Sequence, residues 1–171
     1  GVQTCALPIS KLARECGGAT ILAWMAVLTI LISSLIALNK DNLKARLAFS
    51  TIGQLSYIVL GIAILSPLST TGALYHLVAH AFMKITLFMC AGAIFVTTHK
   101  KNISEMVGLG RRMPITMSAF SLASLGIAGF PFFIGFVSKA NIIMGALQTG
   151  QLLFGATLIV SAILEIGRAS C

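Results

Sequence analysis

Long uncharged apolar stretches alternate with short polar segments along the chain, and this alternation predicts helices that cross a membrane. Each stretch is near or above the ~20 residues that an α-helix needs to span the hydrocarbon core. The stretches are residues 17–39, 47–65, 72–98, 114–138 and 140–164. We therefore expect an all-α integral membrane protein with about five transmembrane helices and no soluble domain.

Composition supports this setting. Of the 171 residues, 57% are hydrophobic and only 9% are charged, whereas soluble domains usually carry about 25% charged residues. A soluble domain of this length has too little interior to bury so much apolar surface. The net charge of +8 does not indicate nucleic-acid binding, because the charges sit in short segments between apolar stretches and no aromatic platform accompanies them.

The charges predict the orientation of the chain. They cluster between the first and second stretches and between the third and fourth, whereas residues 66–71 and 148–151 carry none. The clustered charges are Lys40, Asp41, Lys44, Arg46, Lys100, Lys101, Glu105, Arg111 and Arg112. By the positive-inside rule, residues 39–46 and 99–113 are expected on the cytoplasmic side of a bacterial inner membrane, although Lys11 and Arg14 oppose this.

Prolines mark turns and one helix break. Pro67 is expected in an uncharged loop, and Pro114 suits the first turn of a helix. Pro131 falls in the middle of the fourth stretch, near Gly129 and Gly135. Proline removes a backbone hydrogen bond and glycine permits unusual dihedral angles, so this pattern predicts a membrane helix broken near its midpoint. A simple proline kink is the alternative.

Three groups that can hold a proton lie one turn apart in the third stretch. His76, His80 and Lys84 fall within about 80° of one another on a helix of ~3.6 residues per turn. Ionisable groups inside a membrane are costly and usually face a partner or water, which favours a proton relay. Zinc binding is a weaker interpretation, because His76 and His80 supply two ligands and no neighbouring Cys, Asp or Glu provides a third.

Lys139 is a fourth candidate for proton translocation. It stands eight residues beyond Pro131 and the sequence after it stays apolar, which indicates a position inside the membrane. Snorkelling to the interface is the alternative. Ser50, Gln54 and Tyr57 follow i, i+4, i+7 spacing on one helical face. They either line a polar path for water or bind neighbouring helices.

Both ends of the chain are expected to be foreign. Residues 1–9 and 165–171 are translations of DNA that resembles common sequencing adapters, and a natural hydrophobic terminus is the alternative. Residues 10–164 are then the authentic transmembrane segment. This removes Cys5 and Cys171, and the remaining Cys16 and Cys90 form neither a disulfide framework nor a metal motif.

Four ordered motifs resemble a known family. They are DNLKARLAFSTIGQLSY (41–57), HLVAHAFMKITLFMCAGAI (76–94), ISEMVGLGRRMP (103–114) and GFPFFIGFVSK (129–139). Together they are similar to the antiporter-like membrane subunits shared by the L, M and N chains of respiratory complex I and the Mrp cation/proton antiporters. The resemblance implies a protein of about fourteen helices with two inverted repeats of five, of which this segment resembles the second.

The resemblance also implies roles for single residues. Lys139 is similar to the lysine of the family's broken helix, which passes protons toward the outer side. His76, His80 and Lys84 resemble the central hydrophilic axis that joins two half-channels. The partner lysine and carboxylate of the first repeat are absent from the segment, so the path is incomplete.

Some positions depart from the family pattern. Phe132 replaces a frequent second proline, and Ala140 stands where complex I L chains tend to have an acidic residue. Asn42, where complex I chains mostly have Asp, and the CAGAI and GLGRRMP strings are closer to the Mrp D subunit.

Three functions stay open at this stage. The first is a proton-translocating subunit of a sodium/proton antiporter, with other membrane subunits as partners. The second is a proton-pumping subunit of NADH-quinone oxidoreductase, which would make the chain part of an enzyme. The third is a structural membrane subunit. No cofactor is expected, because the sequence has no nucleotide-binding or hydrolytic motif.

Overall fold

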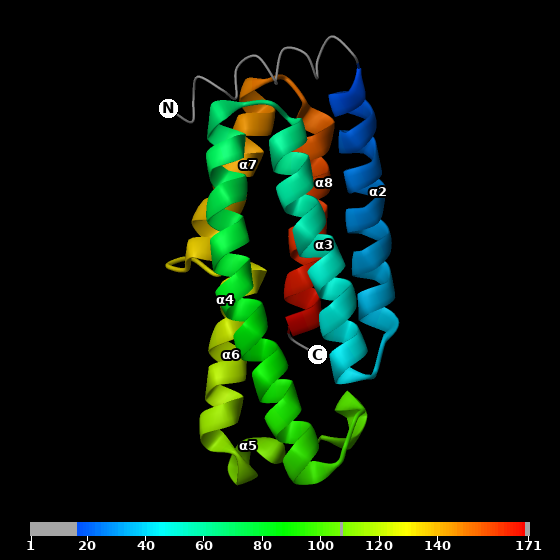
Figure 1. The fold of residues 1–171 in the computed structure, drawn as a ribbon, viewed down its shortest axis with the longest axis vertical. Helices are drawn as coiled ribbons and strands as arrows, with labels where there is room; N and C mark the ends of the chain where they lie inside the picture. The colour runs from blue at the N-terminus through cyan, green and yellow to red at the C-terminus, as the bar shows by residue number, and fades with distance from the viewer. Residues whose placement is uncertain (1–16, 107, 170–171) are drawn as a thin grey trace.

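The computed structural model describes residues 17–106 and 108–169, and these residues form an elongated helical bundle (Figure 1). The elements are α2 (Gly18–Asn39), α3 (Leu43–Ala63), α4 (Pro67–Thr98), the 3₁₀ turn η1 (Ile103–Glu105), α5 (Leu109–Arg112), α6 (Pro114–Ala128), α7 (Ile134–Gln148) and α8 (Leu152–Ala169). Residues 1–9, which the sequence indicates to be foreign, lie outside the described residues.

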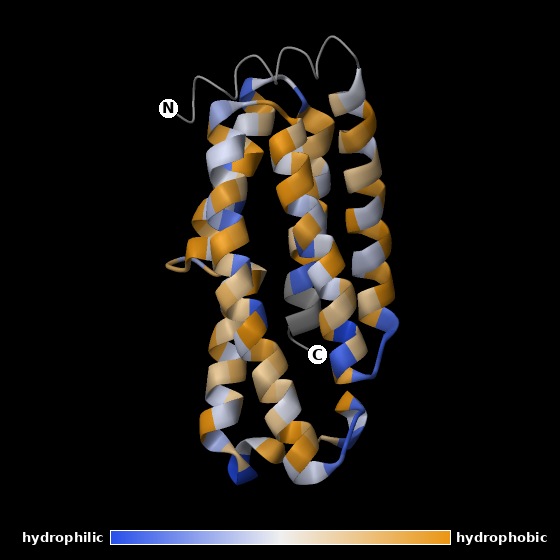
Figure 2. Ribbon diagram, viewed as in Figure 1, coloured by the Kyte–Doolittle hydropathy of each residue, from blue (hydrophilic) through white to orange (hydrophobic). Residues whose placement is uncertain are grey.

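The helices alternate in direction along the bundle, except that α6 and α7 run the same way. In the view of Figure 1, α2 descends, α3 rises and α4 descends again. The α6 and α7 helices rise one after the other, and α8 returns from the top. α2 packs along α3, and α4 packs along both α6 and α7. The segments around residues 40–42 and 99–113 therefore meet at one end, which Figure 2 shows to be hydrophilic.

Local capping explains why two helices begin earlier than the apolar stretches. The side chain of Asn42 accepts a hydrogen bond from the backbone N–H of Ala45, which starts α3 at Leu43 rather than at residue 47. Pro67 occupies the first turn of α4, so its placement in a loop was wrong. Its fixed φ and missing N–H suit that position. Pro114 begins α6 in the same way.

The bundle has apolar side chains on its outside, and its interior holds polar and charged side chains as well as apolar ones. Large apolar side chains of α4 face outward, among them Phe82 at 73% and Met89 at 71% exposure. Orange bands along the helices in Figure 2 mark such surfaces. The buried polar or charged side chains are Ser33, Ser34, Gln54, Ser56, Ser66, Ser69, His76, His80, Lys84, Ser138, Lys139, Ser161 and Glu165. Lipid contact explains this arrangement, because hydrocarbon solvates apolar side chains and excludes polar ones.

Three described helices are long and apolar enough to cross a membrane: α2, α3 and α4. The residues expected to form a fourth and a fifth spanning helix are divided into shorter elements. α6 and α7 have 15 residues each, and together they cover the fourth stretch and the start of the fifth.

Two clusters of buried apolar side chains hold the helices together. One joins α2, α3, α7 and α8 through Ile30, Leu60, Ile142 and Leu158. The other joins α3, α4, α5 and α6 through Leu47, Leu87, Leu109 and Ile127. The buried polar side chains of α3, α4 and α7 lie between these helices, where packing fixes their positions.

Candidate functional site

α6 and α7 follow one another in the same direction, and residues 129–133 between them interrupt the helix. α6 ends at Ala128, and Gly129 follows with a left-handed φ of 89°. Pro131 lies in the connection, and Phe132 has a φ of 82°. Proline is fixed near −65°, so a second proline cannot replace Phe132 in this conformation.

The two half-helices cross at very short range. A Cβ atom at Gly135, in the first turn of α7, would overlap the carbonyl oxygen of Gly126. Only glycine permits this approach. The crossing places the carbonyl end of α6 against the first turns of α7.

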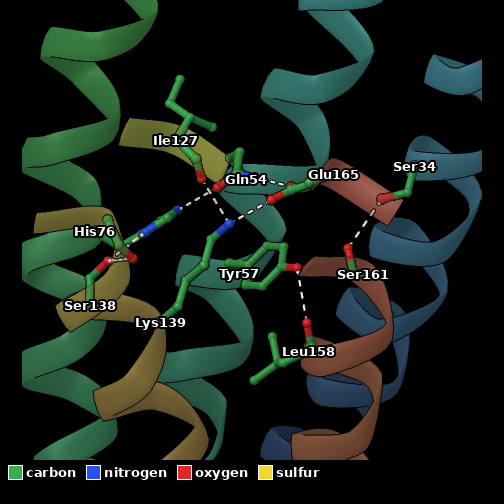
Figure 3. A network of polar contacts seen from close by, with 11 residues as sticks. Ser34, Gln54, Tyr57, His76, Ile127, Ser138, Lys139, Leu158, Ser161 and Glu165 are labelled. Carbon is green, nitrogen blue, oxygen red and sulfur yellow. Dashed lines mark hydrogen bonds and ion pairs between the residues drawn. The ribbon is translucent and has the colours of Figure 1, made fainter. Parts of the chain in front are cut away.

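Lys139 points from α7 back to the end of α6 (Figure 3). Its Nζ atom donates a hydrogen bond of 2.9 Å to the backbone carbonyl of Ile127 and lies 5.3 Å from the ring centre of Tyr57. The side chain is 6% exposed. The last carbonyls of a helix carry negative partial charge, which attracts an ammonium group. The half-helix end therefore solvates Lys139.

Lys139 also forms an ion pair, which the sequence analysis did not predict. Its Nζ lies 2.5 Å from Oε2 of Glu165, and both side chains are buried. Glu165 is the first residue of the C-terminal segment that is expected from the sequence to be foreign. The contacts of Lys139 with Ile127 and Tyr57 do not involve it.

His76 is held between two helices. Its Nδ1 lies 2.9 Å from the hydroxyl of Ser138 on α7, and its Nε2 lies 2.7 Å from the amide oxygen of Gln54 on α3. The Gln54 amide nitrogen donates to Glu165. Figure 3 shows these groups as one chain of polar contacts that reaches Lys139. The structure thus brings His76, Gln54, Tyr57 and Lys139 together.

His80 and Lys84 continue the row along α4. The rings of His76 and His80 stack with centroids 6.2 Å apart and an interplanar angle of 19°. The Nζ of Lys84 donates to the backbone carbonyl of Leu47 at 3.1 Å. All three side chains of the triplet are at most 6% exposed. Four groups that can hold a proton therefore occupy the interior of the bundle.

A cavity of about 460 Å³ lies beside Lys84, between α3, α4 and α6. Most of its lining is apolar, and its polar lining includes Arg46, Ser50, Lys84, Ser121 and Ser124. A water molecule occupies about 30 Å³ in the liquid, so the cavity has room for several. Ser50 borders this cavity rather than joining the contacts around His76.

The charged end of the bundle is ordered by its own hydrogen bonds. The hydroxyl and the backbone N–H of Ser104 both donate to the carboxylate of Asp41. The backbone N–H of Ile103 donates to the carbonyl of Asp41 at 2.9 Å. The hydroxyl of Ser104, followed by its N–H, holds the pKa of Asp41 below its ordinary value of 3.8. This contact ties the α2–α3 connection to the segment after α4.

A metal site is not assembled by the described part of the chain. Within it, no group of three or more His, Cys, Asp or Glu side chains is placed to hold an ion. Cys90 is buried as a free thiol.

Sequence reasoning missed several partners of the candidate residues. Ser138 was not singled out, although it precedes Lys139 in the quoted motif GFPFFIGFVSK. The backbone carbonyls of Ile127 and Leu47 carry no sequence signal. Their role follows from the break in the helix and from the packing of α3 on α4, which only the fold reveals.

Comparison with protein families gives one match over most of the chain. The family described as NADH:quinone oxidoreductase/Mrp antiporter, TM matches residues 11–164. The chain is 40% identical over 144 residues to NADH-quinone oxidoreductase subunit N of Desulforudis audaxviator, which covers 84% of this chain and 29% of that protein. It is 40% identical over 136 residues to subunit L of Buchnera aphidicola, with 78% and 21% covered.

Solved structures give a similar result. A chain in the structure of the Mrp complex from Dietzia sp. matches with a TM-score of 0.81 and 32% identity, over 86% of this chain and 28% of that one. A chain of the membrane-bound sulfane sulfur reductase, an archaeal respiratory membrane complex, matches with a TM-score of 0.79 and 31% identity, over 85% and 24%. The chain spans less than a third of the length of these relatives.

Proposed function

Because this chain belongs to the transmembrane family of NADH:quinone oxidoreductases and Mrp antiporters, we propose that it is the second-repeat segment of a longer subunit that moves protons across a membrane. The observation that supports this proposal most strongly is a row of buried side chains that can take up a proton: Lys139, His76, His80 and Lys84. Such groups are costly in a membrane interior, and a proton path is a function that requires them.

The contacts of the row suit reversible protonation. The carbonyl end of α6 and the Tyr57 ring lie where they attract an ammonium at the end of the Lys139 side chain. Along α4, His80 lies between His76 and Lys84, and the rings of His76 and His80 stack. Figure 3 shows His76 near Lys139. Water in the cavity beside Lys84 would give that end of the row access to protons.

Orientation follows from the positive-inside rule. The charged end that holds Lys40, Lys44, Arg111 and Arg112 faces the cytoplasm. Ser138, the neighbour of Lys139, contacts His76, which lies about two turns farther from that end than Lys84 along α4. Protons enter through parts of the subunit outside this segment and leave by way of Lys139. Other membrane subunits surround the chain in the assembled complex.

We assign the subunit first to a multisubunit sodium/proton antiporter. Asn42 and the strings CAGAI and GLGRRMP favour the Mrp D subunit, and the match to the Dietzia Mrp complex agrees with this choice. A proton-pumping chain of NADH-quinone oxidoreductase is the second candidate, favoured by the 40% identity to a subunit N. Membrane vesicles separate the two. Sodium addition alone drives proton movement in an antiporter, whereas electron transfer from NADH drives it in the oxidoreductase.

The experiment that tests proton translocation uses the full-length subunit in its assembled complex. Lys84→Ala and Lys139→Ala should each abolish proton transport while the complex still assembles on a native gel. Lys40→Ala, a change of the same type at an exposed site outside the bundle, should transport normally. If the buried lysines only pair with neighbouring helices, both variants will fail to assemble. Normal transport in both variants would refute the proposal.

A further inference from the structure

The imidazole of His76 has one ring nitrogen whose proton is fixed by its partner. Nε2 lies 2.7 Å from the side-chain oxygen of Gln54, which can only accept a hydrogen bond. Nε2 therefore carries the proton when the ring is neutral. Nδ1 is then the atom at which His76 gains or loses a proton.

Nδ1 faces a hydroxyl that can hydrogen-bond to the ring in both its neutral and its protonated state. The Oγ of Ser138 lies 2.9 Å from Nδ1 and 3.0 Å from the carbonyl oxygen of Gly135. When the ring is neutral, the hydroxyl donates a hydrogen bond to Nδ1. When the ring is protonated, Nδ1–H donates to Oγ and the hydroxyl turns to Gly135. In both states Ser138 keeps its own proton, and only the hydroxyl hydrogen rotates.

The fold holds this contact at a fixed distance. Ser138 is fully buried, and Gly72 lies one turn before His76 on α4. A Cβ at Gly72 would lie 2.9 Å from the carbonyl oxygen of Ser138. Two turns further along α7, a Cβ at Gly145 would lie 2.6 Å from the Cβ of Ser69. Both glycines let α4 and α7 approach closely, which keeps His76 within hydrogen-bond reach of Ser138.

We propose that Ser138 is the positioning residue of the proton path: its hydroxyl holds His76 in one orientation through the whole protonation cycle, while Gln54 fixes the neutral tautomer. This inference rests on the proposed function, because it assigns Ser138 a part in proton transfer through His76. Without the hydroxyl, neutral Nδ1 has no donor and protonated Nδ1 has no acceptor within a buried site. A buried polar group without a hydrogen-bond partner is energetically costly, so both the neutral and the protonated ring are destabilised in this orientation.

The test compares Ser138→Ala with Ser138→Thr in the full-length assembled complex. Proton transport by Ser138→Ala should fall about tenfold, which corresponds to the loss of one hydrogen bond to a charged group. Ser138→Thr retains a hydroxyl and should recover most of the rate. Ser161→Ala is the matched control, because Ser161 is also fully buried but pairs with Ser34 at 3.2 Å, away from any histidine.

Nitrogen NMR of labelled histidine provides a second measurement. Its result would not change if Ser138 had only a structural role. The His76 signals are assigned by their loss in His76→Gln. In the wild type, Ser138→Thr and Ser161→Ala, the Nδ1 signal of the neutral ring should be that of a hydrogen-bonded nitrogen. In Ser138→Ala it should move to the position of a nitrogen without a hydrogen bond. If Ser138→Ala does not assemble, Ser138→Cys replaces it, because a thiol fills the same space and hydrogen-bonds weakly.

The outcomes separate this inference from the proposed function. Transport that survives Lys84→Ala and Lys139→Ala contradicts the proton path itself. Transport that depends on both lysines, together with a normal rate or an unchanged Nδ1 signal in Ser138→Ala, overturns the role of Ser138 and leaves the path intact. A reduced rate and a shifted Nδ1 signal in the same variant support the proposal.

Discussion

The Nζ of Lys139 donates to the backbone carbonyl of Ile127, twelve residues earlier and on the far side of the helix break, at 2.9 Å. In a continuous helix that carbonyl would accept from the N–H of residue 131, but Pro131 has none. The proline leaves the carbonyl free, and the break turns α7 so that Lys139 reaches it. The interruption therefore creates the polar environment that a buried lysine requires.

Gly135→Ala should destabilise the protein by about 1–3 kcal/mol, since the added Cβ overlaps the backbone carbonyl of Gly126 and forces the half-helices apart. Thermal unfolding of the full-length subunit in detergent measures the effect. Gly92→Ala is the control, because nothing lies within 4 Å of the added Cβ on α4. There alanine should stabilise by up to about 1 kcal/mol. Equal melting temperatures for the two variants would contradict the close crossing.

Phe132→Pro should lower stability by about 3 kcal/mol or more, although many relatives are expected to have a second proline in this region. The φ of 82° at Phe132 lies outside the range of a proline ring. Phe132→Gly tests the same φ angle, and the opposite effect on stability is expected, because glycine readily adopts a positive φ. Since the side chain is fully exposed, glycine should unfold at the same or a higher temperature. A stable proline variant would show that the connection has another conformation.

The contact between Asp41 and Ser104 should weaken as the pH falls into the acid range. Hydrogen bonds from Ser104 lower the pKa of Asp41, so they stabilise the folded state above the ordinary value of 3.8. This stabilisation is lost as the pH falls further, through the lowered pKa. Hydrogen exchange of the Ser104 amide should therefore stay slow at neutral pH and become faster only in acid below that value.

Asp41→Ala should make the Ser104 amide exchange quickly at neutral pH as well. Lys40→Ala removes a neighbouring side chain that does not contact Ser104 and should leave the exchange slow. Slow exchange in Asp41→Ala would mean that the carboxylate does not hold the segment after α4.

Gln54→Leu tests the second partner of His76. Leucine has a similar size but cannot accept the hydrogen bond from Nε2, and Gln54 is fully buried. Proton transport should fall about tenfold, because a buried donor is left without a partner. Ser56→Ala on the same helix is the control, since the Ser56 hydroxyl only bonds the carbonyl of Ile52. If Gln54→Leu and Ser56→Ala reduced proton transport equally, the loss would be due to altered packing of α3 and not to the hydrogen bond with His76.

Apolar stretches and Gly–Pro punctuation were enough to predict the helical membrane architecture and an interruption near Pro131. The spacing of His76, His80 and Lys84 placed them on one face of one helix. Helix starts were less predictable, because Asn42 and Pro67 extend α3 and α4 by capping geometry rather than by hydrophobicity.

Partners of the candidate residues were harder to predict. A serine in an apolar helix usually bonds a carbonyl of its own helix. Ser138 does so with Gly135, and its second contact with His76 depends on the approach of α4 to α7. The spacing of Ser50, Gln54 and Tyr57 placed them on one face, but Ser50 borders the cavity while the other two lie beside His76 and Lys139.

Proton uptake into liposomes that contain the full-length complex tests the central claim most directly. Lys139→Gln keeps a side-chain donor for the carbonyl of Ile127 and removes the charge that a proton path needs. The account predicts an assembled complex whose proton flux is abolished, with Lys40→Gln transporting at the wild-type rate. Proton flux at the wild-type rate through Lys139→Gln would contradict it.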